Sequence, residues 1–118
     1  MFSKIRGFKV FNKDFNTCIS YILEKAKTGK VHVVSGNPEV LTFGEKDKLL
    51  NDEFKKDTTV IIPDGIGVVI ASKFAGEPVS EKIAGIEVVE KLLSIYEKEN
   101  KGIFLLGAKE EVIVDTYK

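Results

Sequence analysis

A chain of 118 residues that is 43% hydrophobic and 31% charged has the size and composition of one globular domain, which excludes a largely disordered chain. Its 18 Lys and Arg residues balance 18 Asp and Glu residues, so binding of nucleic acid through an overall positive field is not expected. The single cysteine, Cys18, can form neither an internal disulfide nor a cysteine-rich zinc site, and a cytoplasmic location is expected.

The first predicted elements are a short β-hairpin and an amphipathic helix. Apolar residues alternate weakly around Gly7 within residues 2–11, which predicts two short strands joined by a turn. From Asp14 to Gly29 the apolar residues recur at helical spacing, and Gly29 ends the pattern. This helix is expected to cover one face of a sheet.

A strand, a tight turn and a helix follow. The β-branched run at residues 31–35 predicts the strand. In the turn, Asn37 can cap a helix and Pro38 can occupy its first position. The mixed polar and apolar pattern of residues 39–56 predicts that helix, with a break near Gly44.

The remaining residues continue the alternation of strands and helices. The continuous apolar run at 58–63 is typical of a strand that is buried on both faces of a parallel sheet. Helices are predicted at 66–74 and 85–99, a third buried strand at 103–106, and a last helix from Lys109 onward.

This order predicts an α/β fold, a Rossmann-like open parallel sheet with flanking helices and an N-terminal β-hairpin. Ligands of such sheets bind outside the carboxyl ends of the strands. Candidate site residues therefore lie in the turns that begin at Ser35, at Asp64 and at Gly107. The whole chain, residues 1–118, is expected to form a single α/β domain.

Asp64 is the first candidate, because it places a carboxylate directly after a buried strand and before Gly65 and a helix. A carboxylate at this rim can act as a general base. Asp-Gly is also a common turn dipeptide, and Asp64 can equally cap the helix that follows it. The pattern alone leaves both roles open.

The other turns are weaker candidates. Ser35 and Asn37 offer a hydroxyl and an amide at a helix N-terminus, which suits either an anionic ligand or an ordinary capped helix. Gly107 begins a turn that differs from both the dinucleotide fingerprint and the P-loop. Lys82 can meet a diphosphate or remain in solvent.

Two reactive residue types are not expected to act in catalysis. His32 is the only histidine of the sequence, so a histidine-based triad and a metal site are both improbable. Cys18 falls among core positions of the first helix, which favours packing. Residues 1–30 carry seven basic and two acidic side chains, an excess that a solvated face explains as well as an anionic partner does.

Four segments taken in order, residues 35–39, 63–69, 81–85 and 103–107, resemble the signature of the WecG/TagA/CpsF glycosyltransferases. The resemblance implies transfer of N-acetylmannosamine or a related sugar from a UDP donor to a polyprenyl-diphosphate-linked acceptor. Such reactions serve the biosynthesis of wall teichoic acid, enterobacterial common antigen or capsule.

The resemblance also assigns residues to roles. Asp64 falls on the proposed general base of the family's Pro-Asp-Gly motif, whereas Ser35 and Asn37 fall on donor-binding positions. Lys82 falls where the family has arginine, whose planar fork grips a diphosphate more firmly than a lysine point charge does. The motif glycines Gly65 and Gly107 complete the expected substrate site.

The implied mechanism is an inverting transfer that needs no metal cofactor, which agrees with the lack of an Asp-x-Asp motif in the sequence. Family members continue with a further α/β portion and a basic C-terminal appendage that brings the enzyme to the membrane. The chain is therefore expected to be the N-terminal part of a longer catalytic domain, with weak or absent activity alone. A position at the inner face of the cell membrane is expected for the full-length family.

Two further expectations follow from the sequence. An open sheet that lacks neighbouring strands exposes an edge and apolar surface, so homo-oligomers are expected. The alternative to an enzyme is a non-catalytic module, either one that binds nucleotide-sugars without turnover or one that resembles a receiver domain. A receiver needs an acidic pair after the first parallel strand, where this chain has Ser35, Gly36 and Asn37.

Overall fold

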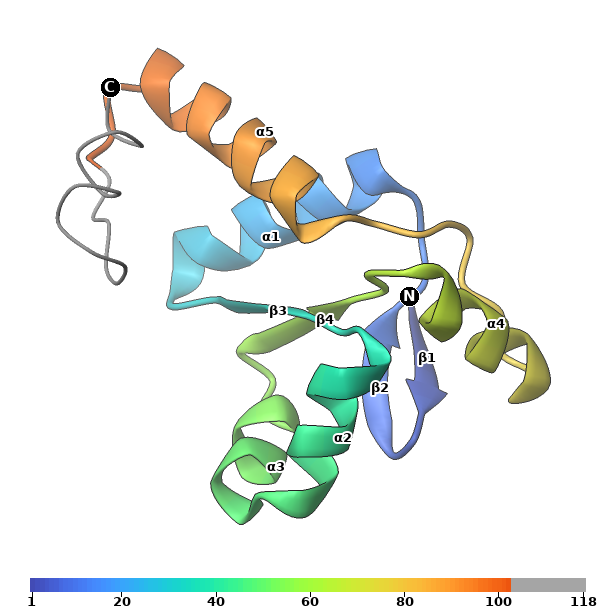
Figure 1. The fold of residues 1–118 in the computed structure, drawn as a ribbon. Helices are drawn as coiled ribbons and strands as arrows, with labels where there is room; N and C mark the ends of the chain where they lie inside the picture. The colour runs from blue at the N-terminus through green and yellow to red at the C-terminus, as the bar shows by residue number, and fades with distance from the viewer. Residues whose placement is uncertain (103–118) are drawn as a thin grey trace, which may run out of the picture.

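The computed structural model of the chain describes residues 1–102 and shows one mixed sheet with helices on both faces (Figure 1). In this described part of the chain the sheet has four strands, in the order β1-β2-β4-β3. Their bounds are β1 Phe2–Ile5, β2 Phe8–Phe11, β3 His32–Ser35 and β4 Thr59–Ile62. β1 and β2 form an antiparallel hairpin, and β2, β4 and β3 run parallel. The predicted α/β fold and its N-terminal hairpin are confirmed.

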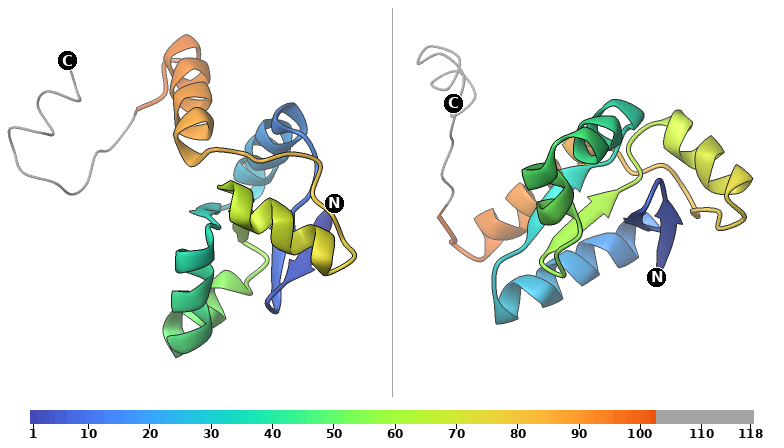
Figure 2. Two further views of the ribbon diagram at one scale, coloured as in Figure 1. Left: turned by 45° about the vertical axis from the view of Figure 1, so that its right-hand side comes forward. Right: turned by 90° about the horizontal axis from the view of Figure 1, so that it is seen from below.

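Within residues 1–102 five helices follow or join these strands: α1 Phe15–Thr28, α2 Pro38–Lys46, α3 Lys48–Phe54, α4 Ile66–Phe74 and α5 Gly85–Lys98. The helices α1 and α5 lie on one side of the sheet, and α2, α3 and α4 lie on the other (Figures 1 and 2). This division matches the two separate hydrophobic clusters of the core. The helices predicted at 66–74 and 85–99 are present within one residue.

The central strand β4 contributes to both clusters. Ile61 packs with the cluster beneath α2, α3 and α4, whereas Val60 and Ile62 pack with the cluster beneath α1 and α5. All three side chains are fully buried. The continuous apolar run predicted a strand that is buried on both faces, and β4 is buried on both faces.

The hairpin turn is made by Arg6 and Gly7, both with positive φ, as a type I′ hairpin turn requires. The Arg6 guanidinium also forms a two-pronged ion pair with Glu45 of α2, through N–O distances of 2.6 and 3.0 Å. The hairpin is thereby tied to the helical layer.

The predicted helix over residues 39–56 does break, but at Asp47 and not near Gly44. Asp47 ends α2 and caps α3, because its Oδ1 accepts from the amides of Leu49 at 2.9 Å and Leu50 at 3.2 Å. Gly44 instead lies buried inside α2, facing the Phe54 ring. The lack of a side chain at Gly44 allows close packing against that ring, and the helix continues through this residue.

Gly44→Ala is expected to lower the free energy of unfolding by about 1–3 kcal/mol, a typical cost of overpacking a core. An added Cβ would lie 2.6 and 2.8 Å from two carbons of the Phe54 ring and 3.1 Å from Phe8. Urea denaturation measures the change. The matched control is Gly29→Ala, where a Cβ meets nothing within 4 Å. Equal stability of the two variants would contradict the packing role of Gly44.

The strand predicted at 103–106, the turn at Gly107 and the helix from Lys109 lie outside the described residues.

Candidate functional site

The candidate site lies at the edge of the sheet where β3 and β4 end and where α2 and α4 begin. The turn after β3 is held against β4, because the Gly36 amide donates to the Ile62 carbonyl at 2.8 Å. A Cβ on Gly36 would overlap with the Ile61 side chain and lie 2.9 Å from that carbonyl oxygen. Glycine is therefore needed for the chain to turn this close to the neighbouring strand.

The connection between α4 and α5 brings a third helix N-terminus to this edge. The Ile83 amide donates to the Pro63 carbonyl at 2.8 Å, which fixes the chain beside the end of β4. Farther back, Glu81 Oε1 accepts from the Phe15 amide at 2.6 Å and so caps α1. As a result, α5 begins next to Asp64, the residue after Pro63.

Asp64 is partly buried, and its Oδ2 accepts from the Gly85 amide at 3.2 Å. Gly85 is the first residue of α5, where the helix dipole favours a negative charge. Of the two roles left open for Asp64, capping of the following helix α4 is not observed: Gly65 is the N-cap residue there, and no side chain provides a capping hydrogen bond. The carboxylate is instead held at the start of a helix twenty-one residues away in the sequence.

Ser35 lies against the same glycine. A Cβ built on Gly85 would overlap with Ser35 Oγ and lie 3.4 Å from Asp64 Oδ2. The hydroxyl that ends β3 and the carboxylate that follows β4 are thus brought together over the first turn of α5. The space between them exists because residue 85 carries no side chain.

The other residues predicted for the site do not take part in this contact between Ser35, Asp64 and Gly85. Asn37 caps α2, since its Oδ1 accepts from the Val40 amide at 2.9 Å. Gly65 adopts φ +102°, a conformation that favours glycine, at the start of α4. Lys82 is exposed, and its ammonium has no ion pair or hydrogen bond within residues 1–102. Gly107 lies outside the described residues.

Two residues with clear roles at this edge were not assigned by the sequence pattern. Gly85 was expected only to begin a helix, although it makes room for Ser35 and holds Asp64. Glu81 belongs to no predicted site, and its capping of α1 joins segments 66 residues apart. The signal that the sequence offers for Gly85 is its place at the end of the segment 81–85, where a helix begins. No local pattern in the sequence indicates the role of Glu81.

The reactive side chains elsewhere give no competing site. Cys18 is fully buried, and this burial raises the pKa of its thiol to about 11, so the thiol stays protonated and serves packing, as predicted. His32 is exposed, with Nδ1 at 3.5 Å from a Glu53 carboxylate oxygen. Among residues 1–102 no three potential metal ligands gather, and none of the helices there is long and apolar enough to cross a membrane.

Comparison with known proteins finds a family model described as "Glycosyl transferase WecG/TagA/CpsF family" that matches residues 3–118. A Bacillus subtilis (strain 168) protein named N-acetylglucosaminyldiphosphoundecaprenol N-acetyl-beta-D-mannosaminyltransferase is 33% identical over 111 residues, which cover 92% of this chain and 43% of that protein. A Staphylococcus aureus (strain NCTC 8325 / PS 47) protein of the same name is 30% identical over 112 residues, covering 88% of this chain and 44% of its own length. The chain thus spans less than half the length of these relatives.

Proposed function

The chain belongs to the WecG/TagA/CpsF glycosyltransferase family, and we propose on this basis that it supplies the general base and part of the donor site for transfer of N-acetylmannosamine, or a related sugar, from a UDP donor to a polyprenyl-diphosphate-linked acceptor. The observation that carries the proposal is the position of Asp64, anchored to the first amide of α5 beside Ser35. Because the chain spans 43% of the Bacillus subtilis relative, we assign roles to these residues only and do not assign the complete active site to this chain.

Asp64 has the arrangement that a general base needs. Its Oδ2 is anchored by the Gly85 amide, whereas Oδ1 has no hydrogen-bond partner within residues 1–102. In the proposed reaction Asp64 takes the proton of the acceptor hydroxyl, whose oxygen attacks the anomeric carbon of the donor sugar. The bond from that carbon to the diphosphate oxygen breaks, the configuration inverts, and UDP leaves with the electron pair.

The departing UDP would be steadied by positive groups at the same edge. The helices α2, α4 and α5 begin at this edge, where the N-terminal end of each helix carries partial positive charge, and anions bind well at such ends. In the proposal Ser35 donates its hydroxyl to the sugar or phosphate, and Lys82 adds a full positive charge near the segment that leads into α5. The transfer is proposed to need no metal, because amides and Lys82 supply the charge.

Location and assembly are part of the proposal. A polyprenyl-linked acceptor is held in a membrane, so we place the reaction at the inner face of the cell membrane, with the protein associated peripherally. Apolar side chains of α4 and α5 that remain exposed, such as Phe74 and Ile86, are consistent with further contacts to other protein surface. Self-association is the proposed contact.

Lys82→Gln is expected to weaken UDP binding about tenfold, the loss of one charge-assisted contact to a diphosphate. Lys82→Arg is expected to bind UDP at least as tightly as the wild-type chain, because arginine can contact two phosphate oxygens at once. Isothermal titration calorimetry with UDP and with UDP-N-acetylhexosamines provides the dissociation constants.

Lys91→Gln on the exposed surface of α5 is the matched control for charge. A UDP dissociation constant that is the same in Lys82→Gln and in this control would remove Lys82 from the donor site. If the chain binds UDP-sugars but shows no turnover when it is joined to the remaining part of the Bacillus subtilis relative, the nucleotide-sugar-binding alternative is favoured over the enzyme.

A further inference from the structure

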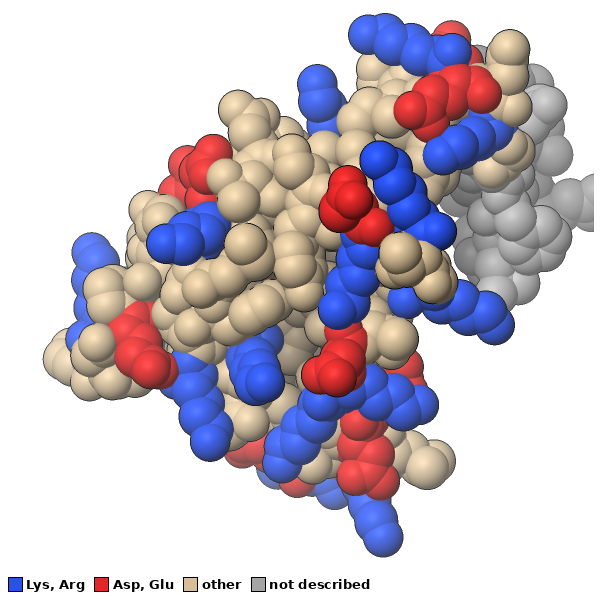
Figure 3. Space-filling view, turned by 180° about the vertical axis from the view of Figure 1, so that it is seen from behind, with Lys and Arg blue, Asp and Glu red and all other residues tan. Residues whose placement is uncertain are grey.

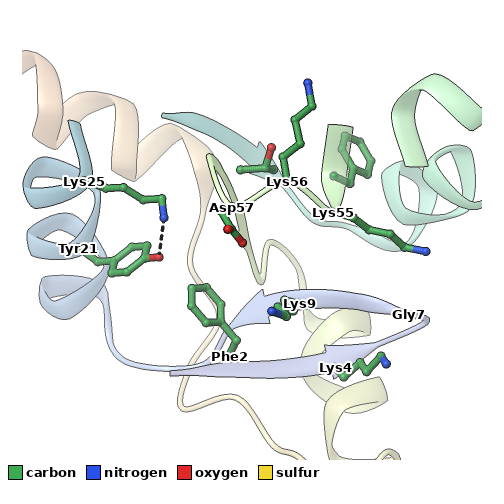
Figure 4. Close-up of a pocket in the computed structure, with 11 residues that line it drawn as sticks. Phe2, Lys4, Gly7, Lys9, Tyr21, Lys25, Lys55, Lys56 and Asp57 are labelled. Carbon is green, nitrogen blue, oxygen red and sulfur yellow. Dashed lines mark hydrogen bonds between the residues drawn. The ribbon is translucent and has the colours of Figure 1, made fainter. Parts of the chain in front are cut away.

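A hollow of about 440 Å³ lies at the opposite end of β4 from the candidate site (Figure 4). Thr59, the first residue of β4, lines it, whereas Asp64 follows the last residue of that strand. The β-hairpin, α1 and the loop between α3 and β4 form its walls. Its volume is within the range of ~300–1,000 Å³ that is common for small-molecule sites.

The walls of the hollow are strongly basic. Five lysines and one carboxylate line it: Lys4, Lys9, Lys25, Lys55, Lys56 and Asp57. They come from four separate segments of a chain whose net charge is zero. In Figure 3, several Lys and Arg side chains, with acidic side chains among them, lie around a hollow in the lower part of the face shown there. The positive charge is therefore concentrated locally, where it attracts anions.

Lys4 and Lys9 carry the most informative pair of charges. They are directly opposite each other in the β1–β2 hairpin. Like charges at such cross-strand positions destabilise a hairpin. Neither ammonium is in an ion pair within residues 1–102. The acidic groups beside the pair are Asp57, which lines the same hollow, and Glu77, whose carboxylate accepts from the Lys4 backbone amide at 2.8 Å. An anion bound between them would turn the repulsion into two attractions.

The remaining walls define the shape of the ligand. Lys25 donates to the Tyr21 hydroxyl at 3.3 Å, and Lys56 pairs with Glu53 at 2.8 Å, so these two ammonium groups are held in place. The rings of Phe2 and Tyr21 meet edge to face at 5.6 Å and form an apolar wall. The hollow is larger than one phosphate requires and offers lysines on both sides of it.

We propose that this hollow binds a diphosphate-bearing ligand, with Lys4 and Lys9 on one side of the diphosphate and Lys55 on the other. The apolar wall accommodates a non-polar group attached to the diphosphate. The site is separate from the one that contains Asp64 and involves no chemical step. Its ligand comes either from solution, as a free diphosphate, or from a membrane, as a phosphate-bearing lipid headgroup.

The test uses inorganic pyrophosphate as the probe, at constant ionic strength adjusted with sodium chloride. Calorimetry and thermal unfolding are recorded for the wild-type chain, for Lys4→Gln/Lys9→Gln and for Lys13→Gln/Lys91→Gln, which removes two exposed charges outside the hollow. The wild-type chain and the control are expected to bind pyrophosphate, and the hairpin variant is expected to bind about tenfold or more weakly.

A second readout separates loss of the site from loss of the fold. Without pyrophosphate, Lys4→Gln/Lys9→Gln is expected to unfold at a temperature equal to or above that of the wild-type chain, because the repulsion between the two lysines is gone. The proposal is overturned if the wild-type chain does not bind pyrophosphate, or if the hairpin variant and the control bind it equally well.

Sedimentation with phosphatidylcholine vesicles, with and without one-third phosphatidylglycerol, distinguishes the two sources of the ligand. Binding to the anionic vesicles that pyrophosphate competes away, and that the hairpin variant lacks, indicates a lipid headgroup. Binding of pyrophosphate without binding of vesicles indicates a free diphosphate. Because none of these assays involves sugar transfer, their failure leaves the role of Asp64 unaffected.

Discussion

Asp64→Asn is expected to slow sugar transfer by about 10²–10⁴-fold, the usual contribution of a positioned general base. The amide oxygen of Asn can still accept the Gly85 hydrogen bond, so the local structure is expected to persist. What is lost is the ability to take a proton from the acceptor hydroxyl. The measurement is the ratio of initial transfer rates for the two proteins at equal concentration, each joined to the remaining part of the Bacillus subtilis relative.

Two controls make this result specific. UDP affinity of Asp64→Asn should stay within about threefold of the wild-type value, because the variant removes a base and not a donor contact. Asp52→Asn, an exposed carboxylate on α3, should leave transfer unchanged. A variant in which UDP binding falls as far as transfer would show that Asp64 binds the donor and is not the base.

Gly85→Ala is expected to damage the site and the fold together, with a loss of about 1–3 kcal/mol in the free energy of unfolding. The new Cβ would overlap with Ser35 Oγ, whereas its distance of 3.4 Å from Asp64 Oδ2 is an ordinary contact. Either the serine must rotate or α5 must move away, and in both cases the anchor of the carboxylate is disturbed. Urea denaturation and UDP calorimetry measure the two effects.

The double variant Ser35→Ala/Gly85→Ala tests this cause directly. Removal of the hydroxyl leaves the Ser35 Cβ at 3.6 Å from the added methyl group, an ordinary contact. Most of the lost stability should therefore return. The double variant should lose less free energy of unfolding than the sum of the losses in the two single variants. Additive losses in the double variant would mean that Ser35 and Gly85 do not meet as described.

Patterns that extend over a whole element predicted the fold well. The apolar run that became β4 is buried on both faces, and the helix that begins near Asp14 ends before Gly29, as its spacing indicated. The break between α2 and α3 was placed at the wrong residue, because a glycine suggests an interruption while the cap at Asp47 actually causes it. Gly44 lies inside α2 and packs against the Phe54 ring, a tertiary contact that no local pattern shows.

The site was predictable only in part. The topology of a parallel sheet places Ser35 and Asp64 at one edge, and that much follows from the order of the elements. The hydrogen bond from Gly85 to Asp64 depends on how the segment after α4 crosses the ends of the strands. The basic hollow was visible in the sequence only as an N-terminal charge excess, since Lys55 and Lys56 join it through the fold.

The most direct test of the role of Asp64 is a hybrid transferase in which residues 3–118 replace the part of the Bacillus subtilis relative that they match. The assay follows transfer from UDP-N-acetylmannosamine to an N-acetylglucosaminyl-diphospholipid analogue. We predict that the hybrid transfers the sugar and that Asp64→Asn in the hybrid lowers the rate by at least about 100-fold. An active hybrid whose rate is unchanged by Asp64→Asn would contradict the assignment of Asp64 as the base.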